Sequence, residues 1–252
     1  MSDFDRNVAA RGGFADRAAA VDAGLRAYML RVYNYMAAAV ALTGVVAYAT
    51  FNAAVVTDAS GKITALTPFG QTIFSGPLSI VLLLGTLGLV FFISFRINRL
   101  QYTTAMALFM LYAALLGVML SSIFLTYTGA SITRVFFISA ASFGALSLYG
   151  YTTQRDLSPM GSFMIMGLFG IIIASLVNIF LKSSGLDWAI SVIGIGVFAG
   201  LTAWDTQRIK EMYDSMDDDG TMGRKAIMGA LSLYLDFINL FLMLLRVVGD
   251  RR

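Results

Sequence analysis

Seven long apolar stretches constrain the fold of this chain more than any other feature of its sequence. A bilayer core of about 30 Å needs about 20 apolar residues in a helix that rises about 1.5 Å per residue. Backbone polar groups in lipid must be satisfied within the segment, so such stretches indicate helices. The sequence therefore predicts an all-α membrane protein, a bundle of seven transmembrane helices. The stretches are Tyr28–Phe51, Ile73–Phe95, Thr104–Tyr127, Ile132–Thr152, Met160–Leu181, Trp188–Trp204 and Ala226–Val248.

The composition supports a membrane protein and excludes several kinds of chemistry. Apolar residues make up 58% of the chain and charged residues 13%, against about 45–50% and about 25% in soluble domains. The chain has no Cys and no His, which excludes thiol nucleophiles, zinc ribbons and serine–histidine triads. Its net charge of +3 is too small for a nucleic-acid surface. We expect a protein that is not an enzyme, with no resident cofactor and no nucleic-acid partner.

The chain divides into a polar N-terminal segment and one membrane domain. Residues 1–27 are polar, and no short apolar core with a cleavage site follows their arginines as in a signal peptide. We expect this segment to be a mobile cytoplasmic tail. The connections between the stretches are mostly short, so residues 28–249 leave no room for a second domain.

Lysine and arginine residues indicate the orientation, because cytoplasmic loops carry an excess of them. With a cytoplasmic N-terminus, twelve lie on the cytoplasmic side and six on the other. An odd number of spans then places the C-terminus outside. The terminal arginines leave open a second topology, in which the last segment re-enters and both ends are cytoplasmic. The twelve are Arg6, Arg11, Arg17, Arg26, Arg31, Arg96, Arg99, Arg155, Arg208, Lys210, Arg224 and Lys225; the six are Lys62, Arg134, Lys182, Arg246, Arg251 and Arg252.

Asp236 lies near the middle of the last apolar stretch. Insertion of a mid-span Asp costs about 2.5–3.5 kcal/mol, so its side chain should face the bundle interior. Ser232 and Asn239 lie on the same helix face and form a polar stripe with it. This stripe predicts that the C-terminal helix is central in the bundle. A structural alternative is a neutral Asp236 hydrogen-bonded to a neighbouring helix.

Asp205 ends the sixth stretch, and a cytoplasmic loop of about twenty residues returns the chain towards Asp236. Two acids in contact cannot both ionise cheaply, so a shared proton would hold the two helices together and act as a pH sensor and gate. A hard cation such as Ca²⁺ suits two carboxylates once the proton is lost. The nearby cations available to compensate the pair are Arg96, Arg99 and Arg208. The alternative is a solvated carboxylate at the membrane rim.

The sequence contains three further patterns that are less specific. The segments Tyr151–Arg155 and Trp204–Arg208 are similar, either because both are helix boundaries at one membrane face or because the chain contains an internal repeat. The glycines Gly194, Gly196 and Gly200 favour close helix packing over a phosphate loop, since they lie inside a span. The acidic segment 217–220 resembles part of a calcium loop but lacks the later acid of an EF-hand, which favours a solvated turn.

Four motifs resemble the Bax inhibitor-1 family (transmembrane Bax inhibitor motif proteins). The most specific is Leu231–Phe241, with the sequence LSLYLDFINLF, followed by Arg246. The other three motifs open the second span and close the fourth and the sixth. These three are Gly76-Pro77-Leu78, Tyr151-Thr152-Thr153 and Trp204-Asp205-Thr206-Gln207. The resemblance extends from about Arg26 to Gly249.

This resemblance implies a seven-helix bundle wrapped around its last helix and a pH-sensitive calcium leak. The family's gating aspartates match Asp205 and Asp236, which would also contact the transported Ca²⁺. Its compensating arginine near the end of the second span has Arg96 as its nearest match. A second role of bacterial relatives is binding and restraining a membrane-anchored AAA protease, whereas eukaryotic relatives suppress cell death.

Overall fold

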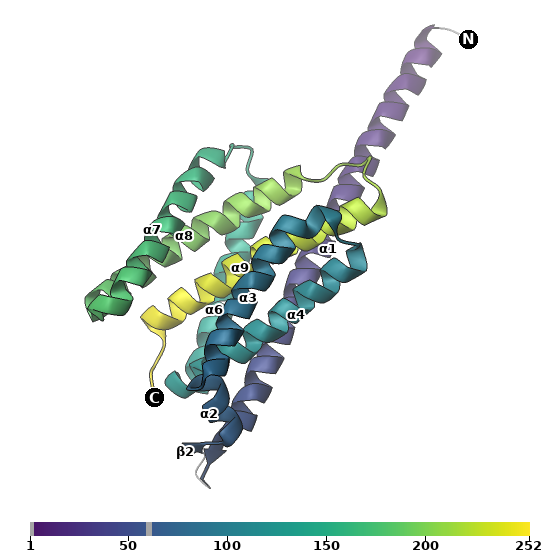
Figure 1. Cartoon of the computed structure of the whole chain (residues 1–252). Coiled ribbons are helices and arrows are strands. Elements are labelled where there is room, and N and C mark those ends of the chain that lie inside the picture. Colours follow the sequence, from purple (N-terminus) through teal and green to yellow (C-terminus); the bar gives the residue numbers. More distant parts are fainter. Residues whose placement is uncertain (1–2, 59–61) are drawn as a thin grey trace.

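Long helices joined by short connections make up nearly the whole of the fold (Figure 1). The computed structural model describes residues 3–58 and 62–252, with side chains from residue 22 onward. The long helices are α1 (Asp3–Ala54), α3 (Pro77–Arg96), α4 (Tyr102–Leu120), α6 (Gly129–Thr152), α7 (Ser158–Leu181), α8 (Ser184–Glu211) and α9 (Asp219–Val248). The short elements are β1 (Val55–Thr57), β2 (Ile63–Leu66), α2 (Pro68–Phe74), the 3₁₀ helix η1 (Ile97–Arg99) and α5 (Ile123–Thr126).

The seven long helices confirm the predicted all-α membrane fold. Each is long and apolar enough to cross a bilayer. The second span starts later than expected, because the chain forms a separate short helix before it. The hydroxyl of Thr67 caps α2 by accepting from the backbone N–H of Gly70, and Gly76 with Pro77 then starts α3. Ile73 therefore belongs to α2.

The polar segment 1–27 is continuous with the first span, since α1 runs from Asp3 to Ala54 without a break. The segment is rich in Ala and contains no Pro, a composition that favours helix. Residues 1–2 lie outside the described residues. The side chains of residues 1–21 also lie outside the described part of the structure. They include Arg6, Arg11 and Arg17, three of the twelve cations expected on the cytoplasmic side. The cytoplasmic location of the segment stays a prediction.

The predicted twenty-residue loop before the last span is wrong, because only residues 212–218 separate α8 from α9. The carboxylate of Asp218 caps α9 by accepting from the backbone N–H of Thr221 at 3.3 Å. Hydrogen bonding to Thr221 also holds the pKa of Asp218 below its usual value. Asp217 forms an ion pair with Lys225 at 2.6 Å. The acidic segment therefore serves as a helix cap, and no cluster of three or more metal-binding side chains occurs among the described residues.

The two ends of the chain lie at opposite ends of the bundle (Figure 1). The α9 helix is one uninterrupted element, long and apolar enough to cross a bilayer, as the seven-span topology expects. The side of the membrane on which the C-terminus lies stays a prediction. The C-terminal residues are attached beside the start of α6. The backbone N–H of Arg252 donates to the Thr126 carbonyl at 2.9 Å, and Arg134 pairs with Asp250 at 2.9 Å.

The last helix is the most buried of the seven spans. Of an 18-residue stretch in α9, 67% is buried, against 11% in α3 and 6% in α7. The α9 helix packs against α1, α4, α6 and α8, whereas α3 and α7 expose many apolar side chains that lipid would cover. That α9 is enclosed on every side stays a prediction.

Candidate functional site

The packing of α8 against α9 brings Asp205 and Asp236 together. Only 7% of Asp205 and 5% of Asp236 are exposed, and the two carboxyl groups lie within hydrogen-bonding reach of each other. The solvated-rim interpretation of Asp205 is wrong, because α8 continues to Glu211 and carries this residue inside the bundle. Two acids far apart in the sequence thus form one buried pair.

The contact between these carboxyl groups needs a proton. Two ionised carboxylates are acceptors only and repel each other at short range. The Oδ1 atom of Asp205 and the Oδ2 atom of Asp236 are buried and accept no hydrogen bond from any other described group. A single proton between the two carboxyl groups would provide the donor that their contact lacks, and that the pair shares one stays a prediction.

One cation lies next to the pair. The Nη2 atom of Arg208 lies 3.2 Å from Oδ1 of Asp205, one turn further along α8. The two atoms form an ion pair by distance but are not aligned as a hydrogen bond. Arg96, the nearest match for the compensating arginine, is exposed at the end of α3. Within the described part of the chain, the cation paired with Asp205 is Arg208.

The other members of the predicted polar stripe do not join the pair by any contact described here. The Asn239 amide donates to the backbone carbonyl of Leu235 on its own helix, at 2.8 Å. Ser232 and Asn239 are both only partly buried, unlike Asp236. Of the three residues in the predicted stripe, only Asp236 is deeply buried.

A chain of hydroxyl groups that no sequence pattern predicts lies beside the acid pair. The hydroxyl of Thr206, next to Asp205, lies 2.9 Å from the Ser147 hydroxyl on α6. The Ser147 hydroxyl lies 2.7 Å from that of Tyr33 on α1. Thr206 also donates to the Thr202 carbonyl of its own helix at 2.8 Å. Polar contacts thus connect α8, through α6, to α1.

The residues after Asp205 attach α8 to the connection between α6 and α7. The Gln207 amide donates to the Arg155 carbonyl at 2.8 Å, and its oxygen accepts from the Leu157 N–H at 2.8 Å. The Lys210 ammonium donates to the Tyr151 carbonyl at 2.9 Å. The two similar segments of the sequence, Tyr151–Arg155 and Trp204–Arg208, therefore meet in space.

Glycines allow close approach at several helix contacts, as predicted for two of the three in α8. A side chain at Gly194 would meet Met243, and one at Gly200 would meet Met164, whereas Gly196 faces open space. Gly150 of α6 allows one such approach, since a Cβ there would collide with the Ala203 carbonyl of α8. This contact holds the two helices together near the acid pair.

The pair alone does not make a complete calcium site. Ca²⁺ takes 6–8 oxygen ligands, and the described residues place no third acid with these two.

The chain is similar to a group of bacterial membrane proteins. A family model described as "Inhibitor of apoptosis-promoting Bax1" matches residues 25–252. An uncharacterized protein of Rickettsia prowazekii is 53% identical over 92% of both chains. The inner membrane protein YbhL of Escherichia coli is 48% identical over 91% of this chain and 94% of its own. An uncharacterized protein of Caulobacter vibrioides is 43% identical over the full length of both chains.

Proposed function

We propose that this chain, which belongs to the Bax inhibitor-1 family, is a proton-gated cation leak in the bacterial inner membrane. The observation that carries the proposal is the buried contact between Asp205 and Asp236, whose carboxyl oxygens lack another donor. Burying two carboxyl groups in a membrane bundle costs free energy, and ionisable residues in such positions occur mainly at functional sites.

The sign of the pH dependence follows from the contact. At low pH one proton lies between the carboxyl groups and holds α8 against α9. As pH rises the proton is lost, and two negative charges at short range repel each other. The contact between the helices weakens, so the leak is small in acid and larger in alkali.

Calcium is the ion that we expect to pass. Two carboxylates provide hard oxygen ligands, which Ca²⁺ prefers, and the cation replaces the lost proton between them. Water and backbone carbonyls exposed by the opening supply the remaining ligands. Arg208, beside Asp205, then limits how tightly the ion is held.

Calcium flux into liposomes that contain the purified protein tests this function. The wild type should leak more as pH rises, and Asp236→Asn or Asp205→Asn should remove most of the pH dependence, because an amide keeps the polar contact but cannot ionise. Asp187→Asn is the matched control, since Asp187 is at the other end of α8 and pairs with Arg246. The same pH profile in the wild type and both pair variants would show that the carboxyl pair is structural.

A second candidate function is binding of a membrane-anchored AAA protease. It is supported by the extension of α1 beyond the apolar stretch, which projects from the bundle (Figure 1). Deletion of residues 2–21 should then abolish co-purification with the protease and leave calcium flux unchanged. Loss of flux with unchanged protease binding would argue against this role.

A further inference from the structure

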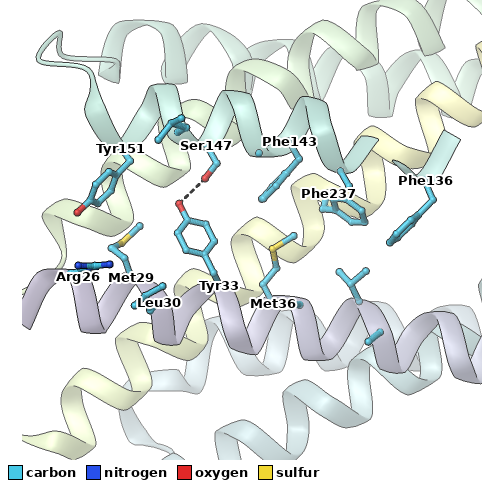
Figure 2. Close-up of a pocket in the computed structure, with 16 residues that line it drawn as sticks. Arg26, Met29, Leu30, Tyr33, Met36, Phe136, Phe143, Ser147, Tyr151 and Phe237 are labelled. Atoms are coloured by element: carbon cyan, nitrogen blue, oxygen red, sulfur yellow. Dashed lines mark hydrogen bonds between the residues drawn. The ribbon is translucent and has the colours of Figure 1, made fainter. Parts of the chain in front are cut away.

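A long apolar groove separates α1 from α6 within the membrane-spanning part of the bundle. Its volume is about 900 Å³, and Phe237 of α9 forms part of its floor (Figure 2). This volume lies within the range of about 300–1,000 Å³ that is typical of sites for small molecules. Apolar side chains such as Met36, Phe136 and Phe143 line most of it.

Two polar groups near the middle of the groove satisfy each other (Figure 2). The hydroxyls of Tyr33 and Ser147 lie 2.7 Å apart and are hydrogen-bonded to each other (Figure 2). Arg26 and Tyr151 lie at one end, and Phe136 lies at the other (Figure 2). The groove therefore has one polar end and an apolar body.

The length of the groove fits an acyl chain. Its lining on α1 extends from Arg26 to Ala41, a rise of fifteen steps that spans about 22 Å at about 1.5 Å per residue. One leaflet of a bilayer core is about 15 Å thick, half of the total. An extended acyl chain that starts at the polar end is therefore accommodated along its whole length.

The polar end carries positive charge. Arg26 is exposed and lies two residues before the apolar stretch begins at Tyr28, at the depth of lipid headgroups. None of the ion pairs among the described side chains includes Arg26. The Lys210 ammonium lies 5.5 Å from the centre of the Tyr151 ring, at the same end. Lys210 does not line the groove and already donates to the Tyr151 carbonyl, so the cation available to an anionic headgroup is Arg26.

We propose that the groove between α1 and α6 binds one anionic phospholipid. An acyl chain lies along Phe143 and Phe136, and the phosphate contacts Arg26. Neither Asp205 nor Asp236 lines the groove. The hydroxyls of Tyr33, Ser147 and Thr206 nevertheless connect the groove to the helix that carries Asp205. A bound lipid would thus stabilise the α1–α6 arrangement next to the proposed gate.

Two pairs of variants of the full chain test the site. Gly144 lines the groove, and a Cβ there meets no protein atom within 4 Å, so Gly144→Phe introduces a large side chain at the groove. Gly170→Phe is its control, an equally open glycine on α7. Arg26→Gln removes the charge at the polar end, and Arg96→Gln removes that of another exposed arginine. Ala140→Leu narrows the same groove and replaces Gly144→Phe should that variant fail to fold.

Native mass spectrometry of the detergent-purified protein, titrated with phosphatidylglycerol or phosphatidylethanolamine, measures the binding. We expect the wild type to prefer phosphatidylglycerol, and Arg26→Gln to weaken that binding about fivefold, as for one cation at a membrane surface. Gly144→Phe should lose both lipids, and the two controls should bind like the wild type.

Three results would overturn the proposal. They are unchanged phosphatidylglycerol binding by Gly144→Phe, equal affinity of the wild type for both lipids, and a dimer that Gly144→Phe dissociates without affecting lipid. The last result would assign the groove to a second copy of the chain.

Discussion

The guanidinium of Arg208 lies 3.2 Å from the carboxylate of Asp205, one turn earlier on the same helix. Trp204, also on this helix, lies 4.8 Å from the same guanidinium, measured to its ring centre. The arginine is held by the ring on one side and faces the buried acid pair on the other. A positive charge in this position favours the ionised form of the pair.

Arg208→Gln should therefore move the pH profile of the calcium leak to higher pH. Without the cation the pair holds its proton to a higher pH, so the contact opens later. The arginine is 44% exposed, and an ion pair of this kind is worth at most about 1 kcal/mol, so the shift should be at most about 1 pH unit. Arg208→Lys should retain most of the wild-type profile, and Arg96→Gln should retain all of it. A shift to lower pH in Arg208→Gln would contradict the assignment.

Gln207→Ala should destabilise the bundle without changing its pH profile. The variant leaves the Arg155 carbonyl and the Leu157 N–H without their buried partner, at a cost of about 1–3 kcal/mol. Thermal unfolding in detergent measures the loss. Gln71→Ala is the control, because the amide of Gln71 is exposed and its bond to the Leu66 carbonyl is long, at 3.4 Å. Equal melting temperatures for the two variants would argue against the attachment of α8 by Gln207.

Gly150→Ala and Gly196→Ala should have opposite effects on stability. The new methyl group at position 150 collides with the Ala203 backbone and forces α6 away from α8, at a cost of about 1–3 kcal/mol. The methyl group at position 196 meets nothing, so it should leave stability unchanged or raise it by up to about 1 kcal/mol through helix propensity. Thermal unfolding of the two proteins in the same detergent compares them. A destabilised Gly196→Ala would show that this face of α8 is covered.

The membrane orientation can be measured with single cysteines, because the chain has none of its own. Met216, between α8 and α9, is 87% exposed, and Lys62, after the first span, is also exposed. A membrane-impermeant maleimide should label Lys62→Cys in intact spheroplasts and Met216→Cys only in inverted vesicles. Labelling of both from the same side would reject the seven-span topology with a cytoplasmic N-terminus.

The number and type of the helices could be predicted because lipid imposes a simple rule on the sequence. Each span must be apolar over its full length, so composition alone locates it. The boundaries were less predictable. Glu211 and Asp219 end and begin helices that continue beyond the membrane core, where polar residues are as acceptable as apolar ones. For that reason the predicted loop of about twenty residues is in fact the last turns of α8, a short connection and the first turns of α9.

The buried acid could also be identified from sequence, but its surroundings could not. Asp236 is conspicuous because a carboxyl group in an apolar stretch is costly. Ser147 and Tyr33 are ordinary residues of their spans, and only the packing of α6 between α1 and α8 makes them part of a polar chain. Arg208 rather than Arg96 pairs with Asp205 because α8 continues past the apolar stretch to Glu211. Hydrophobicity does not reveal how far a helix continues beyond the membrane core.

Infrared spectroscopy of the protein in lipid, recorded across pH, tests the shared proton most directly. The carbonyl stretch of a protonated carboxyl group is separate from that of a carboxylate, and the double variant Asp205→Asn with Asp236→Asn provides the background. The account predicts that the wild type has a protonated-carboxyl band in excess of the double variant, that this excess disappears as pH rises, and that it disappears at a different pH in each single variant. No excess over the double variant at any pH, or an excess that disappears at the same pH in the wild type and both single variants, would contradict a proton shared between Asp205 and Asp236.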